Sequence, residues 1–127
     1  MNESVYVRPM AAADIAAARL LLDQLGYDLT PTEMRRRYAV IANTTGHAIL
    51  VAESEARPVG LVRLYVRPAL DKPPEVVVQA IVIDAAYRSR GIGKILMSAA
   101  ESWTSEQGYN SVALYFKRLS QWRPLVL

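Results

Sequence analysis

The sequence contains no cysteine and only one histidine among its 127 residues. The lack of cysteine excludes a disulfide framework, a thiolate nucleophile and a cysteine-ligated zinc site. No group of His, Asp and Glu residues has the spacing of metal ligands, so we expect no bound metal. The chain does not open with a basic region followed by an apolar run, and no apolar run approaches the ~20 residues of a membrane span. We therefore expect a cytoplasmic protein that does not contact membranes.

The composition is typical of one folded domain. Hydrophobic residues make up 52% of the chain and charged residues 21%, a balance that suits a core and argues against disorder. The length predicts a single domain over residues 1–127. The net charge of +3 is mild, and aromatic and basic residues do not interleave. These features favour a small anionic ligand over a nucleic acid.

Strand-like and helix-like segments alternate along the chain, which predicts an α/β or α+β domain. Alternating and β-branched segments predict five strands, at 4–8, 47–53, 59–66, 75–83 and 111–116. Helix formers and capping residues predict three helices, at about 11–25, 31–42 and 92–107. The resulting order is β-α-α-β-β-β-α-β, followed by an atypical tail over 117–127.

A glycine-bearing loop between the fourth strand and the third helix carries the clearest chemical signal. Its sequence is Arg88-Ser89-Arg90-Gly91-Ile92-Gly93-Lys94. A helix N-terminus presents unpaired backbone N–H groups and the positive end of the helix dipole, which together suit a phosphate. Gly91 and Gly93 lack a Cβ, so a diphosphate could approach the backbone closely. The basic side chains of the loop strengthen the prediction of a phosphate-bearing ligand.

Two familiar phosphate-binding loops do not match this segment. A Walker A loop needs a glycine where this chain has Arg88, and a Ser or Thr where it has Ile95. A Rossmann fingerprint needs a third small residue where this chain has Leu96. The loop is therefore neither a Walker A loop nor a Rossmann dinucleotide-binding loop.

The residues from Arg88 to Gly93 fit the pattern Arg or Gln, two residues, Gly, any residue, then Gly or Ala. This segment resembles the coenzyme A-binding motif of the GNAT N-acetyltransferase superfamily. The apolar strand and turn before it, Ile81–Tyr87, and the helix start after it, Lys94–Met97, extend the resemblance. The alternative is a strand–turn–helix whose glycines only permit tight packing. The resemblance implies a mixed, mostly antiparallel central sheet flanked by helices.

The resemblance also implies a cosubstrate and a reaction. By carry-over, the backbone of Ile81, Val82 and Ile83 would bind the pantetheine arm and acetyl carbonyl of acetyl-CoA. The amides of the loop would bind the diphosphate, and the residues concerned are Arg88, Ser89, Arg90, Gly91, Ile92, Gly93 and Lys94. The implied reaction is direct acetyl transfer to an amine of a small molecule, a protein N-terminus or a lysine. The alternative is a non-catalytic acyl-CoA-binding or regulatory module.

The catalytic residues are harder to place. Some members of the family carry a glutamate base on the central strand, but the corresponding position here is Val77. Glu75 shares its face by simple alternation unless a bulge shifts the register, so it is a candidate base, or else a solvated carboxylate. Tyr115 is a candidate acid, or else a packing residue of the last strand. We expect Gln79 to line the cleft.

The tail and two smaller signals complete the expectations. The eleven residues 117–127 are too few for the helix and strand pair that end the family fold, so these elements are expected to be missing or replaced. An open sheet edge would remain, which predicts a homodimer. His47 is expected to have an ordinary structural or surface role, with a catalytic base as the alternative. Arg35–Arg37 are expected to form a solvated face, with an acidic acceptor as the functional alternative.

Overall fold

The computed structural model of the chain describes residues 4–114, which form a central sheet covered by helices. The strands are β1 (Val5–Pro9), β2 (His47–Ser54), β3 (Arg57–Arg67), β4 (Glu75–Ile83) and β5 (Val112–Leu114). They lie in the order β1-β2-β3-β4-β5, and every neighbouring pair is antiparallel except β4 and β5, which are parallel. This mixed, mostly antiparallel sheet confirms the expected fold class.

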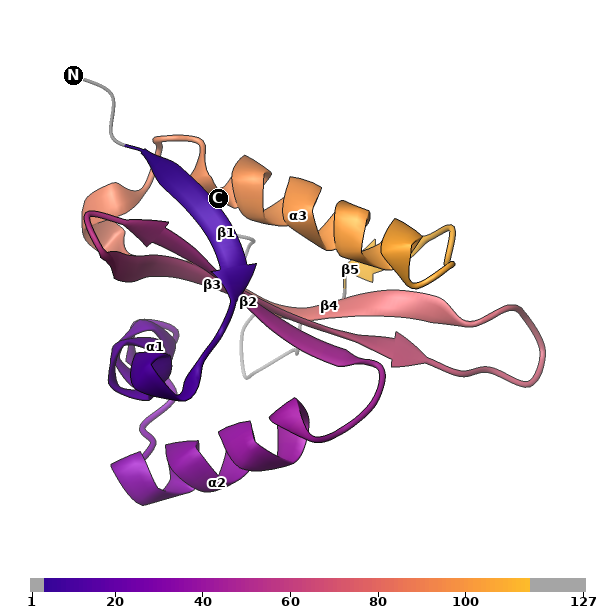
Figure 1. The fold of residues 1–127 in the computed structure, drawn as a ribbon, viewed down its shortest axis with the longest axis horizontal. Coiled ribbons are helices and arrows are strands. Elements are labelled where there is room, and N and C mark those ends of the chain that lie inside the picture. The colour runs from indigo at the N-terminus through magenta and orange to yellow at the C-terminus, as the bar shows by residue number, and fades with distance from the viewer. Residues whose placement is uncertain (1–3, 115–127) are drawn as a thin grey trace.

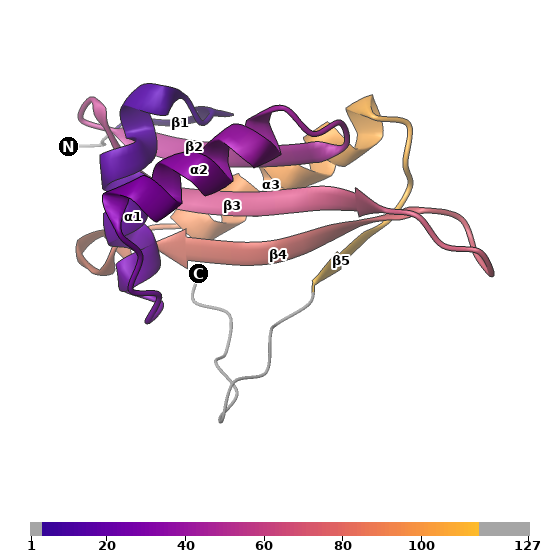
Figure 2. The ribbon, with the colours of Figure 1, turned by 90° about the horizontal axis from the view of Figure 1, so that it is seen from below.

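Helices lie on both sides of the sheet (Figures 1 and 2). The helical elements are η1 (Ala12–Asp14), α1 (Ile15–Asp23), α2 (Pro31–Ala42), η2 (Ala85–Tyr87) and α3 (Ile92–Glu106). Figure 1 shows α3 on one face and α1 with α2 on the opposite face. No helix between residues 4 and 114 is long and apolar enough to cross a membrane.

Helix α2 begins as its sequence predicts. The hydroxyl of Thr30 accepts a hydrogen bond from the Glu33 amide at 3.1 Å, and the Glu33 carboxylate accepts one from the Thr30 amide at 2.9 Å. This reciprocal pair satisfies two amides that the first helical turn leaves free. Pro31 occupies the first helical position, where its missing N–H removes no hydrogen bond.

The first helix departs from the prediction of one continuous helix over 11–25, which was wrong. A short 3₁₀ turn precedes α1, because the buried Asp14 carboxylate accepts a hydrogen bond from the Ala11 amide at 2.8 Å. Arg8 on β1 donates to the same carboxylate at 2.7 and 2.9 Å, and its Nε donates to Glu53 on β2 at 2.8 Å. This network fixes how the chain passes from β1 into α1.

The sheet separates two apolar clusters. The cluster on the α3 face joins α3 to alternate residues of β2, β3 and β4. Gly60 on β3 allows this close packing, since a Cβ there would lie 3.1 Å from Leu96 Cδ1 and 3.3 Å from Ile92 Cγ2. The cluster on the other face holds α1 and α2 and consists of Met10, Ala18, Leu21, Met34, Val51, Leu61 and Val82.

Strand β4 contains a bulge near its middle. Its pairing with β3 passes from Val78 opposite Leu64 to Ala80 opposite Arg63, so Gln79 is an extra residue with no partner of its own. The bulge shifts the side-chain alternation by one residue. As a result Val78 before the bulge and Ile81 after it both pack in the α3 cluster.

Candidate functional site

Among residues 4–114, the sheet opens between β4 and β5. The two strands pair there through Val76–Val78 and Val112–Leu114. Within the described part of the chain, Gln79–Ile83 therefore has β3 as its only neighbouring strand. Alternate backbone N–H and C=O groups of such a segment point away from β3. An extended ligand that carries amide groups can pair with this open edge, in the manner of an added strand. Ile81, Val82 and Ile83 lie along it.

The predicted phosphate loop follows β4 and ends at the N-terminus of α3. Ser89 and Gly91 both have left-handed backbone angles, with φ of 66° and 82°. The first hydrogen bond of α3 runs from the Ile95 amide to the Gly91 carbonyl, at 3.2 Å, so the amides of Ile92, Gly93 and Lys94 have no partner within the helix. A Cβ built on Gly91 meets nothing within 4 Å. The loop thus offers free amides, a helix dipole and open space to an anion.

Basic side chains surround this loop. The Arg88 side chain donates its Nε–H to the Ile83 carbonyl at 3.2 Å, which ties the loop to the end of β4. The Arg90 guanidinium lies 4.9 Å from the centre of the Tyr87 ring, and that of Arg57 lies 5.3 Å from the same ring. Cation–π contacts of this kind hold guanidinium groups in place. Basic side chains therefore border the loop.

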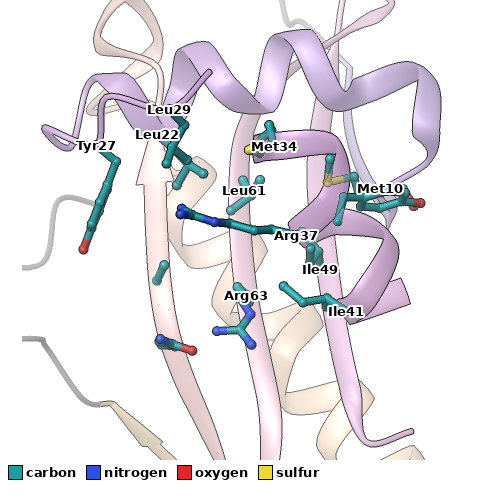
Figure 3. A pocket seen from close by; sticks show the side chains of 13 residues that line it. Met10, Leu22, Tyr27, Leu29, Met34, Arg37, Ile41, Ile49, Leu61 and Arg63 are labelled. Carbon is teal, nitrogen blue, oxygen red and sulfur yellow. The ribbon is translucent and has the colours of Figure 1, made fainter. Parts of the chain in front are cut away.

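A cavity of about 310 Å³ lies on the other face of the sheet, beneath α1 and α2 (Figure 3). The cavity is lined by Met10, Leu22, Tyr27, Leu29, Met34, Arg37, Tyr38, Ile41, Ile49, Leu61, Arg63, Gln79 and Ala80. Its volume is in the range of small-molecule sites, ~300–1,000 Å³. Gln79 lines it, as the sequence predicted. Because Gln79 and Ala80 come directly before Ile81, the cavity and the open edge of β4 meet at the bulge.

Of the two candidate catalytic residues, the described part of the chain includes only Glu75. The Glu75 carboxylate is at the start of β4 and forms ion pairs with Lys72 at 3.5 Å and Arg67 at 4.0 Å. Glu75 does not line the 310 Å³ cavity among the described residues. Tyr115 lies outside the described residues, as does the tail over 117–127. Among residues 4–114, no three His, Cys, Asp or Glu side chains gather into a possible metal site.

Sequence reasoning missed Arg63, which reaches the cavity from β3 (Figure 3). The neighbouring sequence contained one signal that could have identified this residue. Arg63 is the only charged residue in the otherwise apolar stretch from Val59 to Val66. A single charge in such a stretch indicates either the solvent face of a strand or a buried functional group. The sequence alone does not distinguish these two cases.

These features define a domain that can hold a phosphate-bearing ligand beside an opened sheet, with a second cavity next to the opening. The family model described as acetyltransferase (GNAT) family matches residues 15–119 of the chain. The chain therefore belongs to the GNAT acetyltransferase family and is an acyltransferase. This confirms the resemblance seen in the loop.

Solved structures of known acetyltransferases have the same fold. A GNAT family acetyltransferase from Staphylococcus aureus has a TM-score of 0.79 and 21% identity, covering 97% of this chain and 99% of that one. The aminoglycoside N-acetyltransferase AAC(6')-Iy, in complex with CoA, gives 0.81 and 20%, covering 91% and 78%. Glucosamine-6-phosphate N-acetyltransferase from Arabidopsis thaliana gives 0.80 and 21%, covering 89% and 82%. No curated protein sequence matches the chain.

Proposed function

We propose that this protein transfers the acetyl group of acetyl-CoA directly to the amine of a small molecule. The observation that carries the proposal is the meeting of two sites at the bulge of β4. The open edge at Ile81–Ile83 and the loop before α3 suit a long amide-bearing diphosphate. The cavity that Gln79 and Ala80 line suits a second, smaller molecule. Solved relatives of the same fold include a CoA complex and acetyltransferases named for small amines.

The reaction follows from this arrangement. The acceptor nitrogen attacks the thioester carbonyl, a C–N bond forms and the C–S bond breaks. The nitrogen gives up a proton to the base, and the CoA sulfur takes a proton from the acid and leaves as a thiol. Holding the two reactants side by side removes much of the entropic barrier. Backbone N–H groups on the open edge of β4 stabilise the negative charge that develops on the carbonyl oxygen. Glu75 and Tyr115 remain the predicted base and acid.

Thermal unfolding with CoA and acetyl-CoA tests the cosubstrate site. Either ligand at about 100 times its Kd should stabilise the protein by about 2.7 kcal/mol, which raises Tm by several degrees. Release of free thiol in the presence of amines then tests catalysis. Binding without thiol release across a broad amine panel would favour the non-catalytic acyl-CoA-binding alternative.

A matched pair of variants locates the site. Gly91→Glu with Gly93→Glu should abolish the CoA-induced rise in Tm, because two carboxylates would repel the diphosphate. Gly108→Glu is the control. Gly108 also has a left-handed backbone, with φ of 88°, and open space around its Cβ, but it lies beyond the opposite end of α3. Normal CoA binding by the double variant would place the cosubstrate elsewhere.

The proposal also covers the domain organisation, the location and the oligomeric state of the protein. We infer one domain over residues 1–127, a cytoplasmic location and a homodimer. The mass of the protein by light scattering tests the last point, and a monomer at micromolar concentration would contradict it. Glu75→Gln tests the predicted base, since loss of a base should lower kcat with little change in the affinity for acetyl-CoA.

A further inference from the structure

The cavity beneath α1 and α2 contains an unusual set of charges. Among its described lining residues the charged side chains are two arginines, Arg37 from α2 and Arg63 from β3, and no carboxylate is present. Figure 3 shows both arginine side chains extending into the same space from different elements. Most of the remaining lining is apolar. A cavity that receives an ordinary cationic amine would be expected to carry the opposite charge.

Arg63 has no anionic partner in the described structure. Its Nε is buried and has no hydrogen-bond partner. Its Nη2 lies 3.3 Å from Nδ1 of His47, and its guanidinium lies 5.6 Å from the centre of the Tyr65 ring. An unpaired, partly buried cation is costly unless another group compensates its charge. Arg63 therefore suits an anion that comes from outside the chain.

His47 does not provide that anion. An imidazole is either uncharged or cationic, and burial, with secondarily the positive charge of Arg63, lowers the pKa of the His47 ring and so favours its uncharged form. The ring stacks on Tyr65, with centroids 5.4 Å apart, and its Nδ1 faces the guanidinium. This arrangement holds Arg63 in position and leaves its charge intact. The structural role expected for His47 agrees with these contacts.

Arg37 adds a second cation at the cavity. Its ion pair with Glu33, one helical turn away, is 3.7 Å long, and the Arg37 side chain is 60% exposed. An exposed pair of this length is weak and readily exchanged for a better partner. Arg36, the preceding residue, does not line the cavity among the described residues. Arg37 is thus distinguished from its neighbour by position and not by residue type.

We propose that the acceptor is a small amine that also carries a carboxylate or phosphate group, which Arg63 and Arg37 bind. This inference rests on the proposed function and names its substrate class. The apolar part of the acceptor would lie against Leu22, Leu29 and Ile49, and its amine would lie near Ala80, beside the open edge of β4. Guanidinium groups bind both carboxylate and phosphate oxygens through paired hydrogen bonds. The two cations disfavour polycationic amines.

Matched acceptor pairs test this proposal by thiol release. The carboxylate pair is phenylalanine against phenethylamine, with methionine against 3-(methylthio)propylamine as a smaller pair, and the phosphate pair is phosphoethanolamine against ethanolamine. At least one acceptor that carries a carboxylate or phosphate should exceed its partner without that group about tenfold or more in kcat/KM, the usual effect of one charge-assisted hydrogen bond. The pair that shows the preference distinguishes carboxylate from phosphate. Equal rates within every pair, or faster members without the anionic group, would overturn the proposal.

Variants assign the preference to residues. Arg63→Met should abolish the anionic preference, Arg37→Met should weaken it, and Arg36→Met should leave it unchanged. Methionine keeps much of the side-chain volume, and an unchanged Tm rise with CoA verifies that each variant folds and binds cosubstrate. An anionic preference that survives the combined Arg37→Met and Arg63→Met variant would also overturn the proposal.

A binding measurement provides a readout besides activity. Calorimetry on the CoA-loaded protein measures the affinity for the acetylated form of each pair member, for example N-acetylphenylalanine and N-acetylphenethylamine. The measurement is made on both the wild type and Arg63→Met. Tighter binding of the anionic product by the wild type alone supports the inference, and equal binding contradicts it. Failure to bind CoA would instead reject the proposed function, so the two failures are distinguishable.

Discussion

The two faces of the sheet are built differently. On the α3 face, Leu96 and Ile92 pack directly over Gly60, and the apolar cluster there includes residues of three strands. On the face beneath α1 and α2, a cavity of about 310 Å³ remains between the helices and the same strands. The packed face positions the predicted phosphate loop, because that loop leads directly into α3. The hollow face leaves room for a second molecule.

Strand β4 contributes side chains to both faces. Strand β4 alternates its side chains between them, and the bulge at Gln79 shifts this alternation. Val78 and Ile81 both contribute to the packed face, while Gln79 and Ala80 both line the cavity. A regular strand would place adjacent residues on opposite faces. The bulge therefore gives the cavity two adjacent lining residues without opening a gap on the packed face.

The largest expected difference comes from truncating one leucine on each face. Leu96→Ala should lower the free energy of unfolding by about 3–4 kcal/mol, because Leu96 is fully buried and its loss leaves a new void. Leu22→Ala should lower it by only about 1 kcal/mol, because Leu22 is half-buried and already borders a cavity. Urea unfolding measures both values. Equal losses would show that the two faces are packed alike.

A middle-sized effect is expected where β1 leads into α1 on the hollow face. Arg8→Met should destabilise the protein by about 2 kcal/mol at pH 7, because it leaves the Asp14 carboxylate, 7% exposed, without its guanidinium partner. Arg8 holds the pKa of Asp14 below its usual range. The stabilisation is therefore complete above the unfolded pKa of about 4 and disappears as pH falls through the lower folded pKa.

Unfolding of the wild type and Arg8→Met from pH 7 to pH 2 checks this sign. Their stabilities should converge at low pH. Arg35→Met is the control. This exposed arginine donates a hydrogen bond to the Thr32 hydroxyl, and its loss should change stability by less than about 0.5 kcal/mol. A difference that stays constant across the whole pH range would show that Arg8 acts by packing and not by charge.

The smallest expected effects come from adding methyl groups on either face, at Gly60 or at Ala80. One variant should change mainly stability and the other mainly activity. Gly60→Ala should cost about 1 kcal/mol, since its new methyl group would lie 3.1 Å from Leu96 Cδ1, but acetyl transfer should persist. Ala80→Val should leave stability nearly unchanged, because its added methyl groups enter the cavity and valine suits a strand. It should raise the acceptor KM. Unfolding curves and thiol-release kinetics on both variants test this, and unchanged kinetics in Ala80→Val would exclude the cavity as the acceptor site.

Local signals were sufficient for much of the fold. The capping box at Thr30 and Glu33 predicted the start of α2, and the β-branched run from Glu75 to Ile83 predicted β4. Both depend on neighbours within a few residues, which the sequence displays directly. The first helix was harder, because Asp14 binds Arg8 and so belongs to a contact with another element. A tertiary ion pair of this kind overrides the helix propensity of the alanines around it.

The site was only partly predictable for the same reason. The phosphate loop is contiguous in sequence, so its glycines and basic residues could be recognised together. The cavity combines residues from α1, α2, β2, β3 and β4. Arg63 faces it only because of the register between β3 and β4, and Gln79 with Ala80 do so only because of a bulge. Strand register depends on pairing across the sheet, which one sequence does not reveal.

The opening between β4 and β5 has a consequence for how the loaded protein should behave. Among residues 4–114, no strand pairs with the outer side of Ile81–Ile83, and water must solvate the amides that such a strand would bind. If pantetheine lies along Ile81–Ile83, the cosubstrate completes the sheet as a sixth strand would. Amide hydrogens of this segment would then exchange slowly with solvent only while CoA is bound. Each turnover would break and re-form the hydrogen bonds between the cosubstrate and β4.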